Sequence, residues 1–175
     1  MNKKVVVLGG GKGISYLLAG LKDFPLDITA VITVADNGKS TGKLREEFHI
    51  PAVGDVRKVI TSMSGSDENI KKMLEYRFHT TSDLDGHALG NLILTSLLDI
   101  TGSLKASIEE LSILLDVKSK ILPLTEDENI TLMGEATDGS IIEGEEMITK
   151  SPKKIKRLFY KEEPNVLKDE IAAIN

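Results

Sequence analysis

Short apolar runs alternate along this chain with stretches in which apolar residues recur every three or four positions. Residues 5–8 and 28–34 are largely apolar and rich in β-branched side chains, a pattern typical of buried strands in a parallel sheet. Between them, Tyr16, Leu18 and Leu21 recur at helical spacing. A strand, a helix and a second strand in this order form a right-handed crossover with parallel strands. The pattern therefore predicts an α/β fold built on a doubly wound, mainly parallel sheet.

The later part of the chain extends this α/β pattern and adds a hairpin. Apolar spacing predicts further helices near residues 56–63, 70–78, 86–100, 104–115 and 164–174, and strands at residues 120–124 and 158–160. The Asp138–Gly139 pair between two apolar runs predicts a β-hairpin insertion over residues 129–150. An amphipathic helix after a strand normally crosses to a further strand, and none follows here. We therefore interpret residues 1–175 as the N-terminal part of a single nucleotide-binding domain of a longer chain.

Composition and charge narrow the class of function. The 175 residues carry a net charge of −5 and no cysteine. An acidic balance argues against a nucleic-acid partner, and the absence of cysteine suits a cytoplasmic protein. No apolar segment approaches the length of a membrane span, so we expect no membrane insertion. We expect a homo-oligomer whose partner is a small molecule.

Glycines dominate the turn after the first apolar run and make it a candidate phosphate site. Four of the five residues from Gly9 to Gly13 are glycine, although each costs about 0.5–1 kcal/mol relative to alanine in regular structure. A strand, a glycine turn and a helix together aim backbone N–H groups at an anion. The dinucleotide fingerprint is incomplete, because Ile14 stands at its sixth position. The alternative is an ordinary tight turn; the candidate ligands of phosphate are Gly10, Gly11, Lys12 and Gly13.

A second polar loop follows the second predicted strand. The carboxyl ends of neighbouring parallel strands meet at one edge of a sheet, where α/β proteins bind ligands. Asp36 stands where a dinucleotide fold places the acid that accepts hydrogen bonds from ribose hydroxyls. The remaining candidate binding residues of this loop are Asn37, Gly38, Lys39, Ser40, Thr41, Gly42 and Lys43. The alternative is a mobile, solvated surface loop.

Three further polar residues are candidates for the same site. Asp55 stands in the first turn of a predicted helix, where a carboxylate caps free backbone amides or complements the helix dipole. Alternatively, Asp55 and Asp36 share a magnesium ion or orient a substrate hydroxyl. His87 and Asn91 are four residues apart on the predicted helix that starts at Gly86, and we expect them to face a ligand. The alternative for His87 is a buried core histidine.

Four phrases in the right order resemble the gluconeogenesis factor (YvcK-like) proteins, which form one superfamily with 2-phospho-L-lactate transferase (CofD-like). The phrases are residues 7–13 (VLGGGKG), 33–45 (TVADNGKSTGKLR), 54–57 (GDVR) and 86–92 (GHALGNL). Family members are about twice as long, so the resemblance covers the N-terminal half of such a protein. Lys12, Asn37, Lys39 and Thr41 depart from the usual family phrases. Asn37 removes a negative charge and Lys39 adds a positive one, which weakens a metal site and favours direct phosphate contact by lysine.

The resemblance implies a Rossmann-like fold and a regulatory protein that binds a UDP-sugar such as UDP-N-acetylglucosamine. The implied role lies in gluconeogenic growth, cell shape and envelope synthesis, and no reaction or catalytic residue follows from it. The alternative, implied by the transferase branch, is a magnesium-dependent phosphotransferase with a guanine-nucleotide donor. In that branch, acids resembling Asp36 and Asp55 lie near the metal. A plain NAD(P)-binding protein is a third hypothesis, which the missing glycine disfavours.

Overall fold

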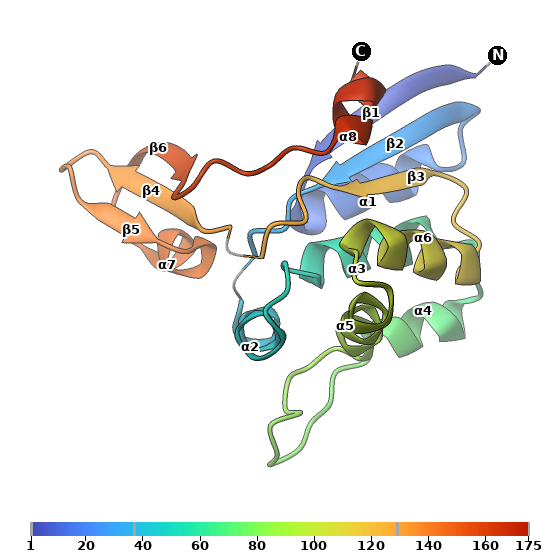
Figure 1. Ribbon diagram of the computed structural model, residues 1–175, viewed down its shortest axis with the longest axis horizontal. Coiled ribbons are helices and arrows are strands. Elements are labelled where there is room, and N and C mark those ends of the chain that lie inside the picture. The colour runs from blue at the N-terminus through green and yellow to red at the C-terminus, as the bar shows by residue number, and fades with distance from the viewer. Residues whose placement is uncertain (1, 37, 129, 175) are drawn as a thin grey trace.

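The computed structural model describes residues 2–36, 38–128 and 130–174 (Figure 1). Helices and strands alternate in the first third of the chain, helices dominate the middle, and a second group of strands follows. In chain order the elements are β1 (Lys3–Gly9), α1 (Gly11–Leu21), β2 (Leu26–Ile32), α2 (Lys39–Phe48), α3 (Gly54–Met63), α4 (Glu68–Glu75), α5 (Leu89–Thr101), α6 (Leu104–Leu114), β3 (Lys120–Pro123), β4 (Leu132–Ala136), β5 (Ile141–Glu143), α7 (Glu145–Lys150), β6 (Ile155–Tyr160) and α8 (Lys168–Ile174).

The predicted parallel sheet forms in the order β1-β2-β3. β1 and β2 run in register, with Gly9 opposite Ile32, so the two strands end at the same edge. This confirms the predicted α/β class and the crossover through α1. The prediction that the first strand is fully buried was wrong, because the side chain of Leu8 is 57% exposed. β1 is one of the two edge strands of this sheet and is less buried than the central strand β2.

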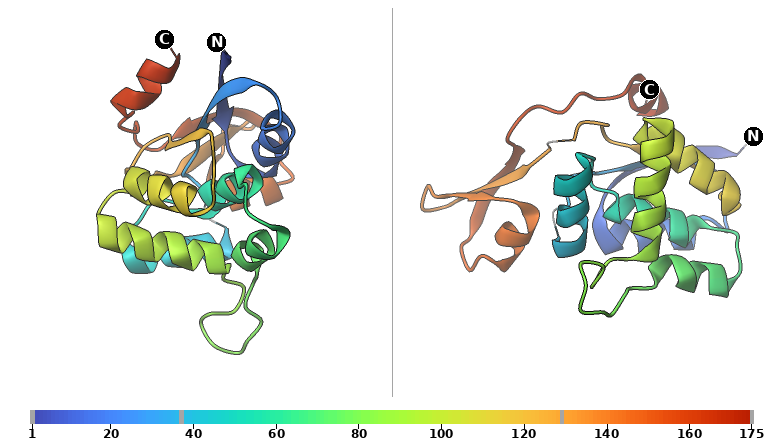
Figure 2. Two further views of the ribbon diagram at one scale, coloured as in Figure 1. Left: turned by 90° about the vertical axis from the view of Figure 1, so that its right-hand side faces the viewer. Right: turned by 60° about the horizontal axis from the view of Figure 1, so that its bottom comes forward.

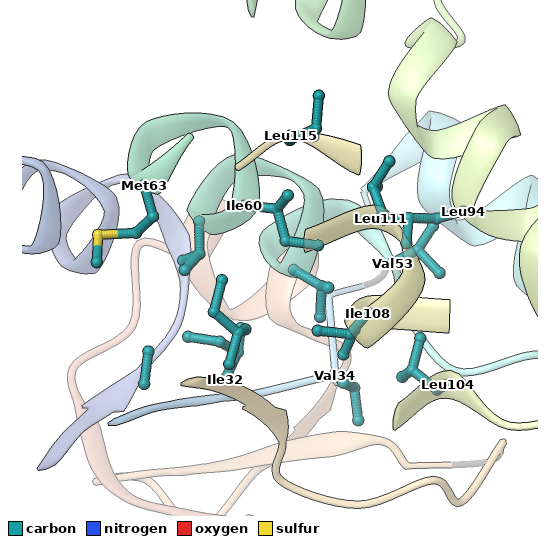
Figure 3. Close-up of a cluster of buried hydrophobic side chains, with 14 of the residues drawn as sticks. Ile32, Val34, Val53, Ile60, Met63, Leu94, Leu104, Ile108, Leu111 and Leu115 are labelled. Atoms are coloured by element: carbon teal, nitrogen blue, oxygen red, sulfur yellow. The ribbon is translucent and has the colours of Figure 1, made fainter. Parts of the chain in front are cut away.

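The core lies between one face of the sheet and the helices α3 and α6. Ile32 and Val34 from the sheet side meet Ile60 of α3 and Ile108 of α6 in one cluster of buried side chains (Figure 3). α4 and α5 form a further layer beyond these helices, and α8 lies on the opposite side of the sheet (Figures 1 and 2). Helices on both sides of a parallel sheet are the arrangement that the crossover pattern predicts.

A second, smaller sheet has the order β5-β4-β6 and is antiparallel throughout. The two predicted hairpin strands pair as β4 and β5, and β6 adds to the other edge of β4. α7 packs against this sheet, and the sequence pattern did not predict that helix. We call residues 132–160 the β-lobe; it stands beside the parallel sheet in Figure 1.

Two predicted boundaries were wrong near the candidate site. The second polar loop ends at Gly38, because residues 39–48 form the helix α2. The helix predicted from Gly86 begins only at Leu89. Gly86 has a φ of 77°, which a right-handed helix excludes, and Ala88 instead forms a β-bridge with Arg77. His87 therefore precedes the helix that carries Asn91, and the two residues do not share a helical face.

Among the residues that the structure describes, none of the helices has the length and apolar character that crossing a bilayer requires.

Candidate functional site

Three helices begin at the edge where β1 and β2 end. α1 follows β1 after Gly10, α2 follows β2 after residue 38, and α3 begins at Gly54. The segment before α3 is held at this edge because the N–H of Ala52 donates to the carbonyl oxygen of Val34 at 3.2 Å. In all three helices the N-cap residue makes no side-chain hydrogen bond to the first turn. By contrast, the side chains of Asp67 and Ser103 cap α4 and α6. The uncapped helix starts leave N–H groups for another acceptor.

Two glycines allow the three helix starts to approach closely. A Cβ atom on Gly10 would stand 2.1 Å from Oγ1 of Thr33 and 2.6 Å from Oδ2 of Asp55. A Cβ atom on Gly54 would stand 2.7 Å from Oγ1 of Thr41 and 3.0 Å from Oδ2 of Asp36. No real Cβ atom tolerates such contacts without a shift of its neighbours. The glycines at these positions therefore serve tertiary packing at the site as well as local turns.

Asp55 occupies the anion position that the glycine turn creates. Its Oδ2 accepts a hydrogen bond from the N–H of Gly11 at 2.5 Å, and its Oδ1 accepts one from Nζ of Lys58 at 2.7 Å. Asp55 is 4% exposed. The carboxylate makes no capping hydrogen bond within α3, but it lies in the first turn of that helix, where it complements the dipole as predicted. In this arrangement the protein's own carboxylate, and not an external phosphate, satisfies the amide of Gly11.

A cavity of about 460 Å³ opens beside the starts of α2 and α3. We call it the Asp36 cavity; it is lined by Asp36, Gly38, Ser40, Thr41, Lys43, Gly54, Arg57, Lys58, Arg77, Asp85, Gly86 and Asn91. Its volume falls in the range of small-molecule sites, about 300–1,000 Å³. The lining combines two helix starts, four cations and two carboxylates. Such a set can bind an anion next to hydroxyl groups.

Arg57 is the buried cation of this cavity. It is 5% exposed, and its Nε donates to Oδ1 of Asn91 at 3.2 Å. Burial lowers the pKa of Arg57, and the nearby charge of Arg77 lowers it further, whereas Glu75 and Asp55 act in the opposite direction. The room for this side chain comes from Gly90, where a Cβ atom would stand 2.8 Å from Cδ of Arg57. Gly90 therefore lets the side chain of Arg57 pack closely against the start of α5.

Carboxylates at the site are held by hydrogen bonds within the protein. Oδ1 of Asp36 accepts from the N–H of Gly38 at 2.8 Å. Partial burial raises the pKa of Glu145, at the start of α7, and the charges of Asp36 and Asp55 raise it further. In the described part of the chain, no three histidine, cysteine or acidic side chains are placed together to hold a metal ion.

The structure brings together part of the predicted site. The predicted residues that line the Asp36 cavity are Asp36, Gly38, Ser40, Thr41, Lys43 and Asn91. His87 is not among the residues that line the cavity. Its Nδ1 lies 3.2 Å from Oγ of Ser40, and the residue is 5% exposed. Lys12 lines a neighbouring cavity, Gly42 faces another one together with Arg45, and Gly13 lies on the exposed side of α1. Asn37 lies outside the described residues, and Lys39 is described only as the first residue of α2.

Four charged residues of the cavity were missed: Arg57, Lys58, Arg77 and Asp85. The first two stand near the start of α3, where the helix dipole disfavours positive charge. Two adjacent cations in that unfavourable position could have been recognised from sequence as candidates for anion binding. Arg77 and Asp85 come from the segment between α4 and α5, whose fold the sequence pattern does not indicate.

Comparison with known proteins agrees with this architecture. The sequence pattern of the family described as 2-phospho-L-lactate transferase CofD matches residues 5–175. The chain belongs to this family. Similar CofD-family relatives include the "Gluconeogenesis factor" of Halalkalibacterium halodurans, 48% identical over 157 residues, and that of Bacillus subtilis, 42% identical over 156 residues. These matches cover 90% and 89% of this chain but only 48% and 49% of the relatives.

A solved structure shows the same fold. The crystal structure of protein BH3568 from Bacillus halodurans superposes with a TM-score of 0.95 at 44% sequence identity. The match covers 99% of this chain and 56% of that protein. The chain thus spans about half the length of the curated relatives, and it reproduces the fold of the matching part of a CofD-family protein.

Proposed function

We propose that this chain is the N-terminal part of a cytoplasmic regulatory protein that binds a UDP-sugar, with UDP-N-acetylglucosamine as the first candidate. The proposed role lies in gluconeogenic growth, cell shape and envelope synthesis. The name of its relatives, "Gluconeogenesis factor", supports the gluconeogenic part of this role. One observation supports a phosphate-containing ligand. Two uncapped helix starts and four cations surround the Asp36 cavity in a protein whose net charge is −5.

The cations of the cavity suit a diphosphate. Lys43, Lys58 and Arg77 carry charge toward the cavity from three different elements, and Arg57 lies buried between them. Charge-assisted hydrogen bonds from lysine and arginine to phosphate are about twice as strong as neutral ones. Amides at the start of α2 add donors in the same cavity. A diphosphate would neutralise positive charge that the protein itself leaves partly unpaired.

The carboxylates of the cavity suit the hydroxyl groups of a sugar. Asp36 and Asp85 line the cavity, and Asn91 presents an amide beside them. Oδ1 of Asp85 accepts from the N–H of Thr80 at 3.1 Å, which fixes the loop that carries it. Carboxylate oxygens accept more than one hydrogen bond each, so both acids retain capacity for hydroxyl donors. Phosphate donors and hydroxyl acceptors in one cavity match the two chemical halves of a sugar phosphate.

A magnesium-dependent transferase is the alternative, in line with the family description. Both of its expected metal ligands are engaged elsewhere: Asp55 with Gly11 and Lys58, and Asp36 with Gly38. A cation already paired with Asp55 competes with a metal for the same oxygen. These contacts favour a metal-independent ligand.

Isothermal titration of the full-length protein tests the proposal. We expect UDP-N-acetylglucosamine to bind equally well with and without magnesium, and GDP to bind more weakly. Lys43→Gln removes one cation of the cavity and should raise the Kd about 3- to 10-fold, since one charged hydrogen bond contributes roughly 1 kcal/mol or more. Lys118→Gln is the matched control, because Lys118 is an exposed lysine that pairs with Asp116. Binding of GDP only in the presence of magnesium would overturn the regulator and support the transferase.

A further inference from the structure

A second cavity of about 430 Å³ adjoins the Asp36 cavity. We call it the Tyr16 cavity; it is lined by Lys12, Ser15, Tyr16, Ala19, Arg57, Lys58, Ser62, Glu75 and Arg77. Arg57, Lys58 and Arg77 line both cavities, so the two cavities share these three cations. The walls come from α1, α3, the end of α4 and the segment after it. Lys12 and Tyr16 line this cavity but not the Asp36 cavity, so the proposed sugar site gives them no role.

Positive charge gathers in the Tyr16 cavity without matching acids. Its lining holds four cations and a single carboxylate, that of Glu75. Within the described residues, Lys58 is the only one of these cations with an acidic partner inside ion-pair distance. Arg77 donates to the neutral carbonyl of Gly86 at 2.6 Å, and its charge acts unfavourably on Arg57. A cavity with this balance attracts an anion, because low-dielectric walls focus the field of unpaired charges.

An exposed aromatic ring stands at the same cavity. Tyr16 is 77% exposed, although aromatic side chains normally bury most of their surface. The hydroxyls of Ser15 and Ser62, also in the lining, donate to the carbonyl oxygens of Gly11 and Val59 at 3.2 and 2.9 Å. Each serine oxygen therefore keeps lone pairs but no proton for a ligand. A flat ring, acceptor oxygens and cations together match the base, the ribose hydroxyls and the phosphate of a nucleotide.

We propose that the Tyr16 cavity binds the nucleoside monophosphate end of the ligand, with the base stacked on Tyr16 and its phosphate held by Lys12 and Arg77. This inference rests on the proposed function, because the diphosphate would lie at the three shared cations and the sugar in the Asp36 cavity. Stacking on one aromatic side chain contributes enough to change affinity about tenfold, and it tolerates any base. The cavity thus supplies affinity for a nucleotide without selecting uracil.

Titration calorimetry with UMP, uridine, inorganic pyrophosphate and UDP-N-acetylglucosamine on the full-length protein tests the inference. We expect Tyr16→Ala to raise the Kd for UMP and the nucleotide sugar about tenfold and to leave pyrophosphate unchanged, whereas Tyr16→Phe keeps the ring and the affinity. Lys12→Gln should weaken UMP and leave uridine unchanged. Phe24→Ala is the matched control, since Phe24 is an aromatic residue just beyond α1 and is 62% exposed.

The outcomes separate this inference from the proposed function. If the affinity for UMP falls in Tyr16→Ala and the nucleotide sugar binds no variant, the result supports a nucleotide site. The same result overturns the UDP-sugar proposal. Nucleotide-sugar affinity that is equal in Tyr16→Ala, Phe24→Ala and the parent chain overturns the Tyr16 cavity and leaves the proposed function standing. Thermal melts of the four variants confirm folding, which substitution of exposed side chains should leave intact.

Discussion

The main-chain N–H of Gly11 donates to Oδ2 of Asp55 at 2.5 Å, and this contact joins the start of α1 to the first turn of α3. The two residues are 44 positions apart in sequence. The bond places a negative charge at the uncapped start of α1, where the helix dipole favours it. It also holds Lys58, the second partner of Asp55, at the boundary of both cavities. The contact therefore links the stability of the fold to the position of a binding-site cation.

Asp55→Ala should lower the free energy of unfolding by about 1–3 kcal/mol, because the N–H of Gly11 then lacks its charged acceptor. Asp55→Asn, which keeps an oxygen of similar position, should lose less. Urea unfolding followed by circular dichroism measures both values. Asp27→Ala is the control, since Asp27 is an exposed acid on β2. A loss no larger than that of the control would mean that this hydrogen bond does not stabilise the junction of α1 and α3.

Gly10→Ala and Gly13→Ala should have opposite effects, although they lie three residues apart. A Cβ atom on Gly10 would collide with Oγ1 of Thr33 at 2.1 Å, whereas the space around Gly13 is empty to 4 Å. Gly10→Ala should destabilise the protein by at least about 1–3 kcal/mol, as overpacking does. Gly13→Ala should stabilise it by up to about 1 kcal/mol, because alanine is the better helix former. Melting temperatures that fall equally in both variants would contradict this difference.

The parallel sheet and its crossover could be predicted because they follow from local patterns. The apolar run at residues 5–8, the glycines after it and the second run near residue 30 together leave few alternative topologies. The position of the candidate site at the shared strand edge follows from the same topology, which explains why Asp36, Ser40 and Lys43 line one cavity. These predictions needed no knowledge of which side chains meet.

The rest of the site depends on tertiary contacts that a local pattern does not contain. α2 was missed because its sequence offers few apolar residues at helical spacing and contains Gly42. Among the side chains of α2 that the structure describes, only those of Thr41 and Leu44 are buried. The pairing of Asp55 with Gly11 appears only when α3 is placed beside α1. The burial of Arg57 likewise depends on Gly90, 33 positions away. The sequence thus indicates which residues have suitable chemistry, but it does not indicate which residues they contact.

Arg45→Gln should loosen the attachment of the β-lobe. Nη2 of Arg45 donates to the carbonyl oxygens of Glu128 and Ile130 at 3.1 and 2.9 Å, which ties α2 to the segment before β4. Loss of these bonds should cost about 1–3 kcal/mol, the usual range for hydrogen bonds from a charged group. Hydrogen exchange should become faster in residues 132–160. Glu46→Gln, an exposed change on the same helix, is the control; equal exchange in both variants would show that the lobe is held by other contacts.

Glu170 on α8 should make the stability of the protein depend on pH. Its side chain is 1% exposed, and neither carboxylate oxygen has a hydrogen-bond partner in the described structure. Burial raises the pKa of Glu170 to about 7, from an ordinary value of 4.5. The folded chain holds the proton of Glu170 more tightly than the unfolded chain does. The contribution of this proton to the free energy of unfolding is therefore complete below pH 4.5. That contribution falls as the pH rises from 4.5 to 7 and is absent above pH 7.

Glu170→Gln removes this titration and should therefore be more stable than the parent chain at pH 8, by about 1–3 kcal/mol, the cost of an unpartnered buried polar group. Near pH 4.5, where the parent side chain is protonated, the difference should disappear. Urea unfolding at pH 4.5, 6 and 8 measures it. Glu163→Gln, an exposed change in the preceding segment, should show no such divergence. Parallel stability curves for Glu170→Gln and the parent chain would show that the Glu170 carboxylate is solvated in the folded protein.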